Sequence, residues 1–509
     1  METFSELLNY DDRGTAVSGP DMDGAFFSVP GAHPPQDTSG SDTIEEVMFN
    51  FLRTLPIAVL SFTLGACSSA PARQGGAADV HALTGAHTRL VWVQGDGTDP
   101  FAVTNRLVLM GLDTDDGRGE RAILEQRGSY VKPMLTPRGD RIAYSTHPDF
   151  GDPAVHIVNF DGSGLRRFDR GFVLDVWEDP ADGGEWIFIG ADQRGAGFTT
   201  VTRVRIDEPW RREQVWNGQA ISADTFQVSP AGTIAGGLFP WPAAGVADLS
   251  TGTWRQFGEG CWTALNDVGA PIFWYFDGAH RNLTMVDVNR DRRWTLPINR
   301  APGFDNPEVY HPRWTNHPRF MAMSGPYNQG GANQVRSGGT QSEVWMGRFS
   351  DDFTRIEAWA RATNNAGGDS YPDVWVDRAQ SSYPQRASGR VGTTGEGEER
   401  SPNRVVAEAR LVRAGAIPTP DSIAPYRNAL VVNTYEIVNL IEGELEGRQL
   451  LVAQWAIREA QVLNDARKPA GQVYRLTVER YEAHPELEGE RLIQGSDLPN
   501  LPLYYEVEP

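Results

Sequence analysis

Three histidines have the residue type and placement that could bind a divalent metal ion. His311 and His317 lie six residues apart on either side of a predicted turn, and His280 lies in the corresponding loop of the preceding repeat unit. If these loops meet at one face, the three imidazoles could share an ion. No His-x-His or Glu-x-x-His spacing ties them together, however, and His-Pro is equally a turn signal. We expect no cofactor, with a divalent metal ion held by these histidines as the open alternative.

A second group of side chains, polar and aromatic, could bind a ligand without performing chemistry on it. Tryptophan stacks on sugars or peptides and arginine pairs with carboxylates, so both types near predicted loop tips are typical of a binding surface. The alternative is that the large aromatic side chains pack between repeat units. The candidate binding residues, called the loop set below, are Trp241, Trp262, Trp274, Tyr275, Asp277, His280, Arg281, Asn282, Arg313, Trp314, Arg319 and Tyr327.

Motifs of nucleophilic catalysis and of phosphate binding are absent from the sequence. It contains no Gly-x-Ser-x-Gly elbow and no recognisable Ser/His/Asp context. The Gly-rich stretch 325–341 has no Walker lysine, so we interpret it as a surface loop rather than a phosphate site. Paired acids such as Asp351-Asp352 fall in predicted hairpin turns, where solvation explains them. These observations favour a binding protein over an enzyme, and we predict no catalytic residue.

The composition is that of a globular, aromatic-rich protein. The 509 residues include 40% hydrophobic residues and 15 Trp, enough for two or three domains with a sizeable core. A net charge of −21 without any basic stripe argues against nucleic-acid binding. The two cysteines, Cys67 and Cys261, form neither a disulfide framework nor a cysteine-based metal site. We expect Cys261 to be a buried core residue.

Residues 48–67 have the layout of a secretory signal. The segment has one basic residue, an apolar stretch of about ten residues and an end rich in small residues. It is too short to span a bilayer as a stable helix. The end, Leu64-Gly-Ala-Cys67-Ser-Ser, resembles the bacterial lipobox. That resemblance implies a lipidated Cys67 and an exported protein of the periplasm or outer membrane, in contact with the membrane only through its lipid anchor. The alternative is a chance apolar segment.

The residues before this segment are unlike the positive start of a signal. Residues 1–47 hold ten acidic residues and one basic residue, Arg13, and are rich in Gly, Pro, Asp and Ser. Our hypothesis is that translation begins at Met48 and that 1–47 are a disordered, wrongly assigned extension. If the extension is genuine, the argument for export weakens. Residues 68–87, rich in small and polar types, predict a tether between the membrane and the folded body.

Residues 88–377 repeat a pattern of short strands separated by Asp-Gly or Asp-Arg turns. Such turns supply the positive φ that tight hairpins need. Units of this size indicate a six-bladed β-propeller, with five or seven blades left open because the boundaries are soft. Each of the three clearest copies consists of three expected strands. The first copy is 141–145, 155–160 and 165–168, and the second is 272–275, 283–288 and 293–296. The third copy is 320–323, 343–349 and 354–358.

The repeat resembles that of the TolB-type, WD40-like propellers. The stretches 133–144, with its Thr-Pro-Arg-Gly-Asp turn, and 155–168 match the family pattern, and 226–234 matches part of it. The sequence 315–318, Thr-Asn-His-Pro, departs from it. The resemblance implies the fold of 88–377 but no single function, because relatives include scaffolds, peptidase-associated propellers and polysaccharide lyases. Lyases of the oligogalacturonate type hold a divalent metal in a histidine cluster.

A second β-rich domain is predicted after a linker. Residues 378–402 lack apolar periodicity and predict a flexible linker. The layout of strands beyond it resembles a small OB-like β-barrel of the netrin kind at 403–509. The two defining cysteines of that family are absent, so the resemblance does not imply inhibitor function. The expected strands are 405–412, 429–443, 449–455 and 474–480.

These features predict an all-β, exported and lipid-anchored binding or scaffold protein of the bacterial cell envelope. Its partner would be an envelope protein or a glycan docked on the loop set, and no nucleic acid. The alternative is a metal-assisted polysaccharide lyase or hydrolase with His280, His311 and His317 as ligands. A third reading is an envelope assembly factor that acts, as TolB does, with a lipoprotein partner. The sequence does not indicate the oligomeric state.

Overall fold

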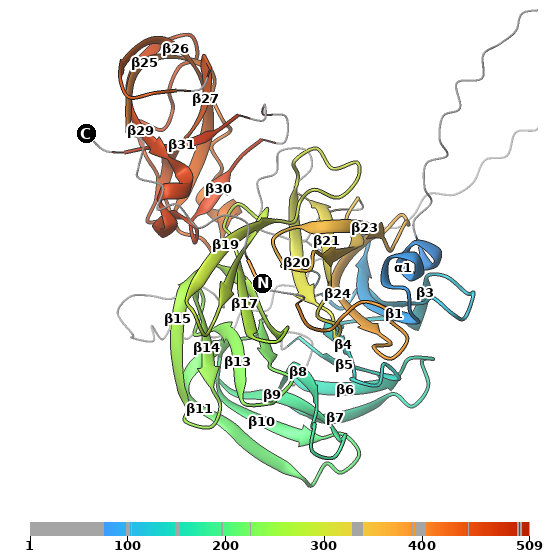
Figure 1. Cartoon of the computed structure of the whole chain (residues 1–509). Coiled ribbons are helices and arrows are strands. Elements are labelled where there is room, and N and C mark those ends of the chain that lie inside the picture. Colours follow the sequence, from blue (N-terminus) through green and yellow to red (C-terminus); the bar gives the residue numbers. More distant parts are fainter. Residues whose placement is uncertain are drawn as a thin grey trace, which may run out of the picture. The chain divides into compact units, whose positions relative to one another are not determined.

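In the computed structural model, a ring of six four-stranded antiparallel sheets is built from residues 88–376 (Figure 1). The structure describes residues 76–507 apart from 98–101, 103, 148–152, 195–196, 224, 328–338, 340, 388–390, 393–403, 446, 496–497 and 499–500, and the described residues belong to one compact unit. The predictions for 1–47, for the signal 48–67 and for lipidation of Cys67 lie outside them, as does most of the loop 325–341. Within the described ranges, no helix has the length and apolarity to cross a membrane.

Blades two to six each consist of four consecutive strands, counted from the axis outward. Blade two holds β4 (Val131–Leu135), β5 (Arg141–Ser145), β6 (Ala154–Asn159) and β7 (Arg166–Arg170). Blade three holds β8 (Phe172–Glu178), β9 (Glu185–Arg194), β10 (Gly197–Arg205) and β11 (Arg212–Ser222). Blade four holds β12 (Phe226–Val228), β13 (Ile234–Leu238), β14 (Ala243–Asp248) and β15 (Thr253–Glu259). Blade five holds β16 (Cys261–Asp267), β17 (Pro271–Phe276), β18 (Asn282–Asp287) and β19 (Arg292–Pro297). Blade six holds β20 (Glu308–Trp314), β21 (Phe320–Tyr327), β22 (Glu343–Phe349) and β23 (Ile356–Arg361).

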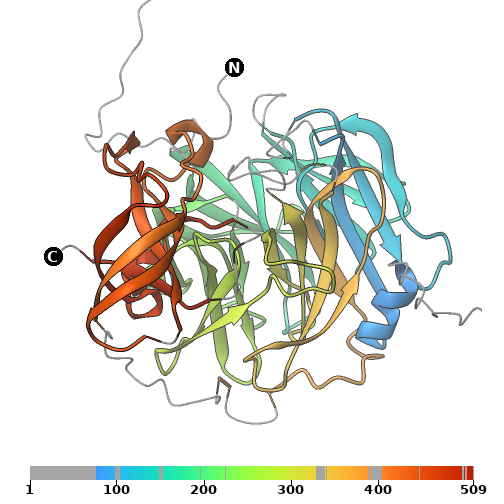
Figure 2. The same ribbon diagram turned by 90° about the horizontal axis from the view of Figure 1, so that it is seen from above.

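Blade one joins the two ends of the propeller. Its innermost strand is β24 (Gly368–Val376), which pairs with β1 (Thr88–Gly95), followed by β2 (Leu107–Asp113) and β3 (Arg121–Gly128). Figure 2 shows the orange strand β24 beside the blue strand β1. Because the last strand completes the first sheet, the ring closes, and the prediction of a six-bladed propeller is confirmed. The repeat read from the sequence starts at the second strand of each blade.

A short helix precedes the first strand. Residues 77–84, inside the predicted tether 68–87, form α1 (Ala77–Thr84). Val80 and Leu83 of this helix are buried in a core cluster with Trp92 of β1. This part of the segment is therefore attached to the propeller, because its apolar side chains gain from burial there.

A tryptophan at the end of an innermost strand ties neighbouring blades together. The indole Nε1 of Trp375 donates to the carbonyl of Pro137 at 2.7 Å, and that of Trp177 donates to Pro230 at 3.1 Å. Gly139, with a φ of +71°, completes the first of these turns, and a Cβ there would lie 2.4 Å from the Trp375 ring. The Pro-x-Gly turn of the repeat thus contacts the tryptophan of the preceding blade through a hydrogen bond and through close packing of the ring against the glycine.

The C-terminal domain is a closed five-stranded barrel. Its strands follow the order β27-β31-β29-β25-β26 and return to β27, with β27 and β31 parallel and the other pairs antiparallel. This order confirms the predicted OB-like barrel. Two short strands pair at its edges, and three 3₁₀ helices lie between strands. The elements are β25 (Val405–Arg413), η2 (Pro420–Ile423), β26 (Ala429–Glu442), β27 (Gln449–Arg458), β28 (Gln461–Val462), β29 (Val473–Arg480), η3 (Tyr481–Ala483), η4 (Pro485–Leu487), β30 (Arg491–Ile493) and β31 (Leu503–Glu506).

The described part of the predicted linker 378–402 contacts the propeller. The Tyr383 ring lies under the guanidinium of Arg348, 4.4 Å from its carbon to the ring centroid. Val391 is buried, and its carbonyl accepts a hydrogen bond from Arg292 Nη1 at 2.9 Å. These contacts hold the chain along blades five and six as it leaves the ring.

Candidate functional site

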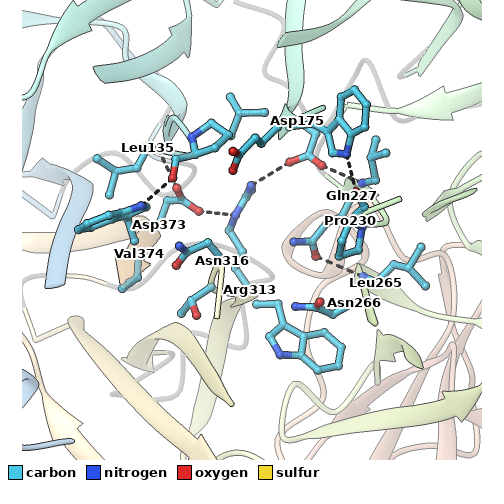
Figure 3. A pocket seen from close by; sticks show the side chains of 18 of the residues that line it. Leu135, Asp175, Gln227, Pro230, Leu265, Asn266, Arg313, Asn316, Asp373 and Val374 are labelled. Carbon is cyan, nitrogen blue, oxygen red and sulfur yellow. Dashed lines mark hydrogen bonds and ion pairs between the residues drawn. The ribbon is translucent and has the colours of Figure 1, made fainter. Parts of the chain in front are cut away.

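One end of the propeller's central channel opens into a cavity of about 370 Å³ (Figure 3). Residues near the carboxyl ends of all six innermost strands line it, so each blade contributes to one mouth. A cavity of this size falls within the range of small-ligand and peptide-tip sites. The polar lining residues nearest the axis are Asp175, Gln227, Asn266, Arg313, Asn316 and Asp373.

Arg313 lies between two carboxylates in the middle of this mouth. Its Nε is 2.6 Å from Asp373 Oδ1, and its Nη2 is 3.5 Å from Asp175 Oδ1. Burial raises the pKa of Asp175 to about 6, against the opposing effect of the Arg313 and Lys132 charges. The middle of the mouth therefore holds two carboxyl groups and one guanidinium, and the pKa of one of these carboxyl groups is raised by burial.

Bonds between blades hold the polar groups of the mouth in place. Asp373 Oδ2 accepts the backbone N–H of Leu135 in the next blade at 2.8 Å. Asp175 Oδ2 likewise accepts the N–H of Val228 at 2.7 Å. Each carboxylate thus has one oxygen fixed by the scaffold and the other facing Arg313. Such fixed side chains lose little entropy when a ligand binds.

Further along the channel, four side chains project from bulges in the innermost strands. Lys132, Trp262, His311 and Tyr371, called the bulge ring below, have φ values of 52°, 43°, 50° and 52°. The strand register shifts around each of them. Positive φ is costly for residues other than glycine and persists where the surrounding structure enforces it, commonly at functional sites. All four residues line one cavity.

The bulge ring encloses a second, narrower cavity of about 30 Å³. Arg313 and Gln227 line both cavities. Three buried polar atoms of residues that line the inner cavity, Thr225 Oγ1, Thr263 Oγ1 and His311 Nε2, have no hydrogen-bond partner among the described residues. Buried polar atoms are rarely left unpaired, so a water molecule or a slender ligand group is expected there.

Six members of the loop set lie beneath the C-terminal barrel instead of at an open face. They are Tyr275, Asp277, His280, Arg281, Asn282 and Tyr327. Tyr275 hydroxyl donates to Glu488 at 2.8 Å, and Arg281 Nη2 donates to the carbonyl of Gln494 at 2.8 Å. The expectation of an open binding face does not hold for this group, because its polar side chains join the two domains.

His280 is fully buried in this interface. Its Nδ1 contacts the Tyr327 hydroxyl, and its Nε2 lies 3.2 Å from the Tyr426 hydroxyl of the barrel. Burial lowers the pKa of His280 to about 4, although Glu308 acts in the opposite direction. Cys261, half-buried rather than in the core, lies 3.3 Å from the same Tyr426 hydroxyl. Both imidazole nitrogens of His280 are thus engaged by the protein.

The three predicted metal ligands do not converge. His311 lies in the bulge ring, whereas His317 lies in the β20–β21 turn, where its Nδ1 accepts the Arg319 N–H at 3.2 Å. Among the described residues, His280, His311 and His317 do not form a group of ligating atoms within 4.8 Å of one another. Their spacing in sequence reflects separate positions along the blades.

Of the remaining members of the loop set, Arg313 and Trp314 line the mouth and Trp262 lines the inner cavity, and the others have structural surroundings. Trp274 and Trp314 stack with ring centroids 4.3 Å apart in the core between blades five and six. Arg319 is buried and donates twice to the carbonyl of Phe349, at 3.1 and 2.7 Å. Trp241 packs edge-on against Tyr426 of the barrel.

Sequence reasoning missed most of the channel. Asp175, Asp373 and Lys132 were not among the predicted site residues, although each carries a charge inside an apolar strand. One signal was available: the tripeptide Asp-Val-Trp occurs at 175–177 and again at 373–375, each time at the end of an innermost strand. A second was the proline that follows Lys132, His311 and Tyr371, because proline inside a strand marks a bulge.

Comparisons with known proteins find similarity among solved structures only. No protein-family model matches the chain, and no curated protein does. Among solved structures, it is similar to TolB from Acinetobacter baumannii, at 15% identity over 58% of this chain and 69% of that one, with a TM-score of 0.41. It is similar to a putative TolB from Agrobacterium tumefaciens at 15% identity over 41% and 68%, with a TM-score of 0.29. A nidogen/laminin complex matches at 7% identity over 56% and 98%, with a TM-score of 0.38. The fold itself rests on the six sheets described above.

Proposed function

We propose that this protein is an exported, lipid-anchored binding or scaffold protein of the bacterial envelope, and that a polar segment of a partner protein enters the channel mouth. The observation that carries the proposal is the cavity of about 370 Å³ around Arg313, with unpaired polar atoms deeper in the channel. The secretory layout of 48–67 and the lipobox-like end at Cys67 support export and anchoring.

The chemistry of the mouth favours a peptide over a sugar. The amide oxygens of Gln227 and Asn266 already accept the backbone N–H groups of Leu265, at 3.2 Å, and Asp267, at 2.8 Å. Their NH₂ groups are left as donors in the mouth, which matches the carbonyl groups of a peptide backbone. Arg313 can exchange one of its two carboxylates for a ligand carboxylate or carbonyl. The indole N–H groups of Trp177 and Trp375 donate to the scaffold, and both rings pack against a glycine turn of the next blade, so they are not free to stack on a sugar.

Site-specific photo-crosslinking in cells tests this function. A crosslinking side chain at Arg378, on the half-exposed rim of the cavity, should yield a protein adduct, whereas one at the exposed Arg255 on blade four should not. The adduct should disappear in the Arg313→Met/Asp175→Asn variant, which keeps the net charge. Adducts of equal yield at both positions, or an adduct that consists of glycan, would contradict the proposal.

A further inference from the structure

We propose a zinc-type metal site at the edge of blade one, formed by His81, His87, Asp113 and Asp115. His87 Nε2 lies 2.8 Å from Asp113 Oδ1, and ligating atoms of His87, Asp113 and Asp115 all lie within 4.8 Å of one another. His81 Nδ1 lies 3.8 Å from Asp115 Oδ1. In the described part of the chain, this is the one place where three such side chains come so close. It is separate from the channel mouth.

Three different segments supply these side chains. His81 comes from α1, and His87 immediately precedes β1. Asp113 ends β2, and Asp115 follows it in the turn toward β3. A site that draws on separate segments is a product of the fold, not of a local run of acids.

Neighbouring groups orient both carboxylates. Arg89 Nε donates to Asp113 Oδ2 at 2.8 Å, and the Asp115 N–H donates to Oδ1, the oxygen that faces His87, at 2.9 Å. Thr114 Oγ1 donates to Asp115 Oδ1 at 2.9 Å. Metal sites characteristically have such supporting hydrogen bonds behind the ligands, because they fix the direction in which the ligand lone pairs point.

The donor set selects the class of ion. Two imidazole nitrogens and two carboxylate oxygens suit zinc, and in second place cobalt or nickel. Calcium and magnesium prefer all-oxygen sites with more ligands. Asp115 and His81 have exposed fractions of 49% and 53%, so an ion can reach the site from solvent.

The site lies at the seam of the ring. The His87 backbone N–H donates to Gln380 Oε1 at 2.9 Å, and the His87 carbonyl accepts the Asp377 N–H at 2.9 Å, just beyond β24. An ion held here would join α1 to the place where the first and last strands of the propeller meet. It would therefore stabilise ring closure.

His484 of the barrel provides a matched comparison. It also contacts two carboxylates, Glu479 at 3.2 Å through Nε2 and Glu486 at 2.8 Å through Nδ1. Since these carboxylates face opposite ring nitrogens, they cannot share one ion with the imidazole. The histidine lies close to acidic side chains at both His87 and His484. The two sites differ in that the ligand atoms lie around one point at His87 and on opposite sides of the ring at His484.

Zinc titration of the full chain, after removal of metal with a chelator, tests the site. We expect one zinc per chain, a rise in melting temperature with zinc, and a tetrahedral cobalt(II) spectrum on substitution. His87→Ala and Asp115→Asn should each weaken zinc binding by about tenfold or more, and His484→Gln should leave it unchanged. Because Asp115 is exposed, its variant tests the site without disturbing the fold. Sub-stoichiometric zinc in the wild type, or a zinc affinity in either His87→Ala or Asp115→Asn that equals that of the wild type, would overturn the proposal.

Discussion

Arg491 Nη2 of the C-terminal barrel contacts both carboxylate oxygens of Glu308 in the propeller, at 2.9 and 2.7 Å. Both side chains are buried. Burial alone would raise the pKa of Glu308, but the Arg491 guanidinium holds it well below its usual range. The two domains are thus joined by an ion pair away from water, where loss of either partner leaves an uncompensated charge.

Replacement of one partner should therefore be costly. Arg491→Met is expected to lower the free energy of unfolding by about 3–5 kcal/mol, because Glu308 remains buried without its counter-charge. Urea denaturation of the full chain measures this. The exposed pair Arg255–Asp291, 2.6 Å apart, is the control, and Arg255→Met should cost under about 1 kcal/mol. Similar decreases in the free energy of unfolding of the two variants would show that the buried pair contributes no more to stability than the exposed pair.

Gly278 lies where the backbones of the two domains approach each other closely. Its N–H donates to the Glu488 carbonyl at 2.9 Å, and a Cβ at this position would lie 1.9 Å from the Glu490 carbonyl oxygen. Gly278→Ala should consequently separate the backbones and destabilise the domain contact by about 1–3 kcal/mol or more. Limited proteolysis should then cleave between propeller and barrel faster than in the wild type. Gly218→Ala, whose new Cβ would have no neighbour closer than 3.8 Å, should leave the cleavage rate unchanged.

The fold was predictable because its signals are local. Hairpin turns such as Asp161-Gly-Ser-Gly and the Thr-Pro-Arg-Gly-Asp turn at 136–140 recur with the blade period and need no knowledge of distant residues. The same holds for the hairpin that became β26 and β27 of the barrel. The innermost strands were harder to recognise in the sequence where they contain bulges, because an extra residue breaks the alternation of buried and exposed positions.

The site was harder to predict because its partners are distant in sequence. Asp175 and Arg313 are 138 residues apart, and each looks unfavourable in its own apolar strand. The polar loop around Asp277 and Arg281 led to the opposite error. Such a loop is typical of a solvated surface, but its partners lie 213 residues further on, in the barrel. Which polar groups are covered depends on domain contacts that no local pattern contains.

Removal of the central guanidinium should produce a pH-dependent loss of stability. In Arg313→Met, the buried Asp175 would lose the nearby cation that opposes the effect of burial on its pKa, which favours its protonated form. The variant should therefore be several kcal/mol less stable than the wild type at pH 7.5, and this difference should shrink at pH 5 as Asp175 binds a proton. Urea unfolding at the two pH values measures the difference. Addition of Asp175→Asn should restore stability at pH 7.5; a difference that does not change with pH would contradict the assigned charge arrangement.

His317 should contribute to acid sensitivity of the folded state. Burial lowers its pKa to about 4, whereas an unfolded histidine titrates near about 6.5. Between these values the unfolded chain binds a proton that the folded chain does not, so the free energy of unfolding falls as pH falls through this window. His317→Asn keeps an acceptor for the Arg319 N–H but removes the titration. Relative to the wild type, the variant should gain up to about 1.4 kcal/mol for each pH unit below 6.5. Urea unfolding at pH 8 gives the packing cost of the substitution alone. If the free energies of unfolding of the two proteins, plotted against pH, stay parallel down to pH 5, His317 is protonated in the folded protein as in the unfolded one, which would contradict this prediction.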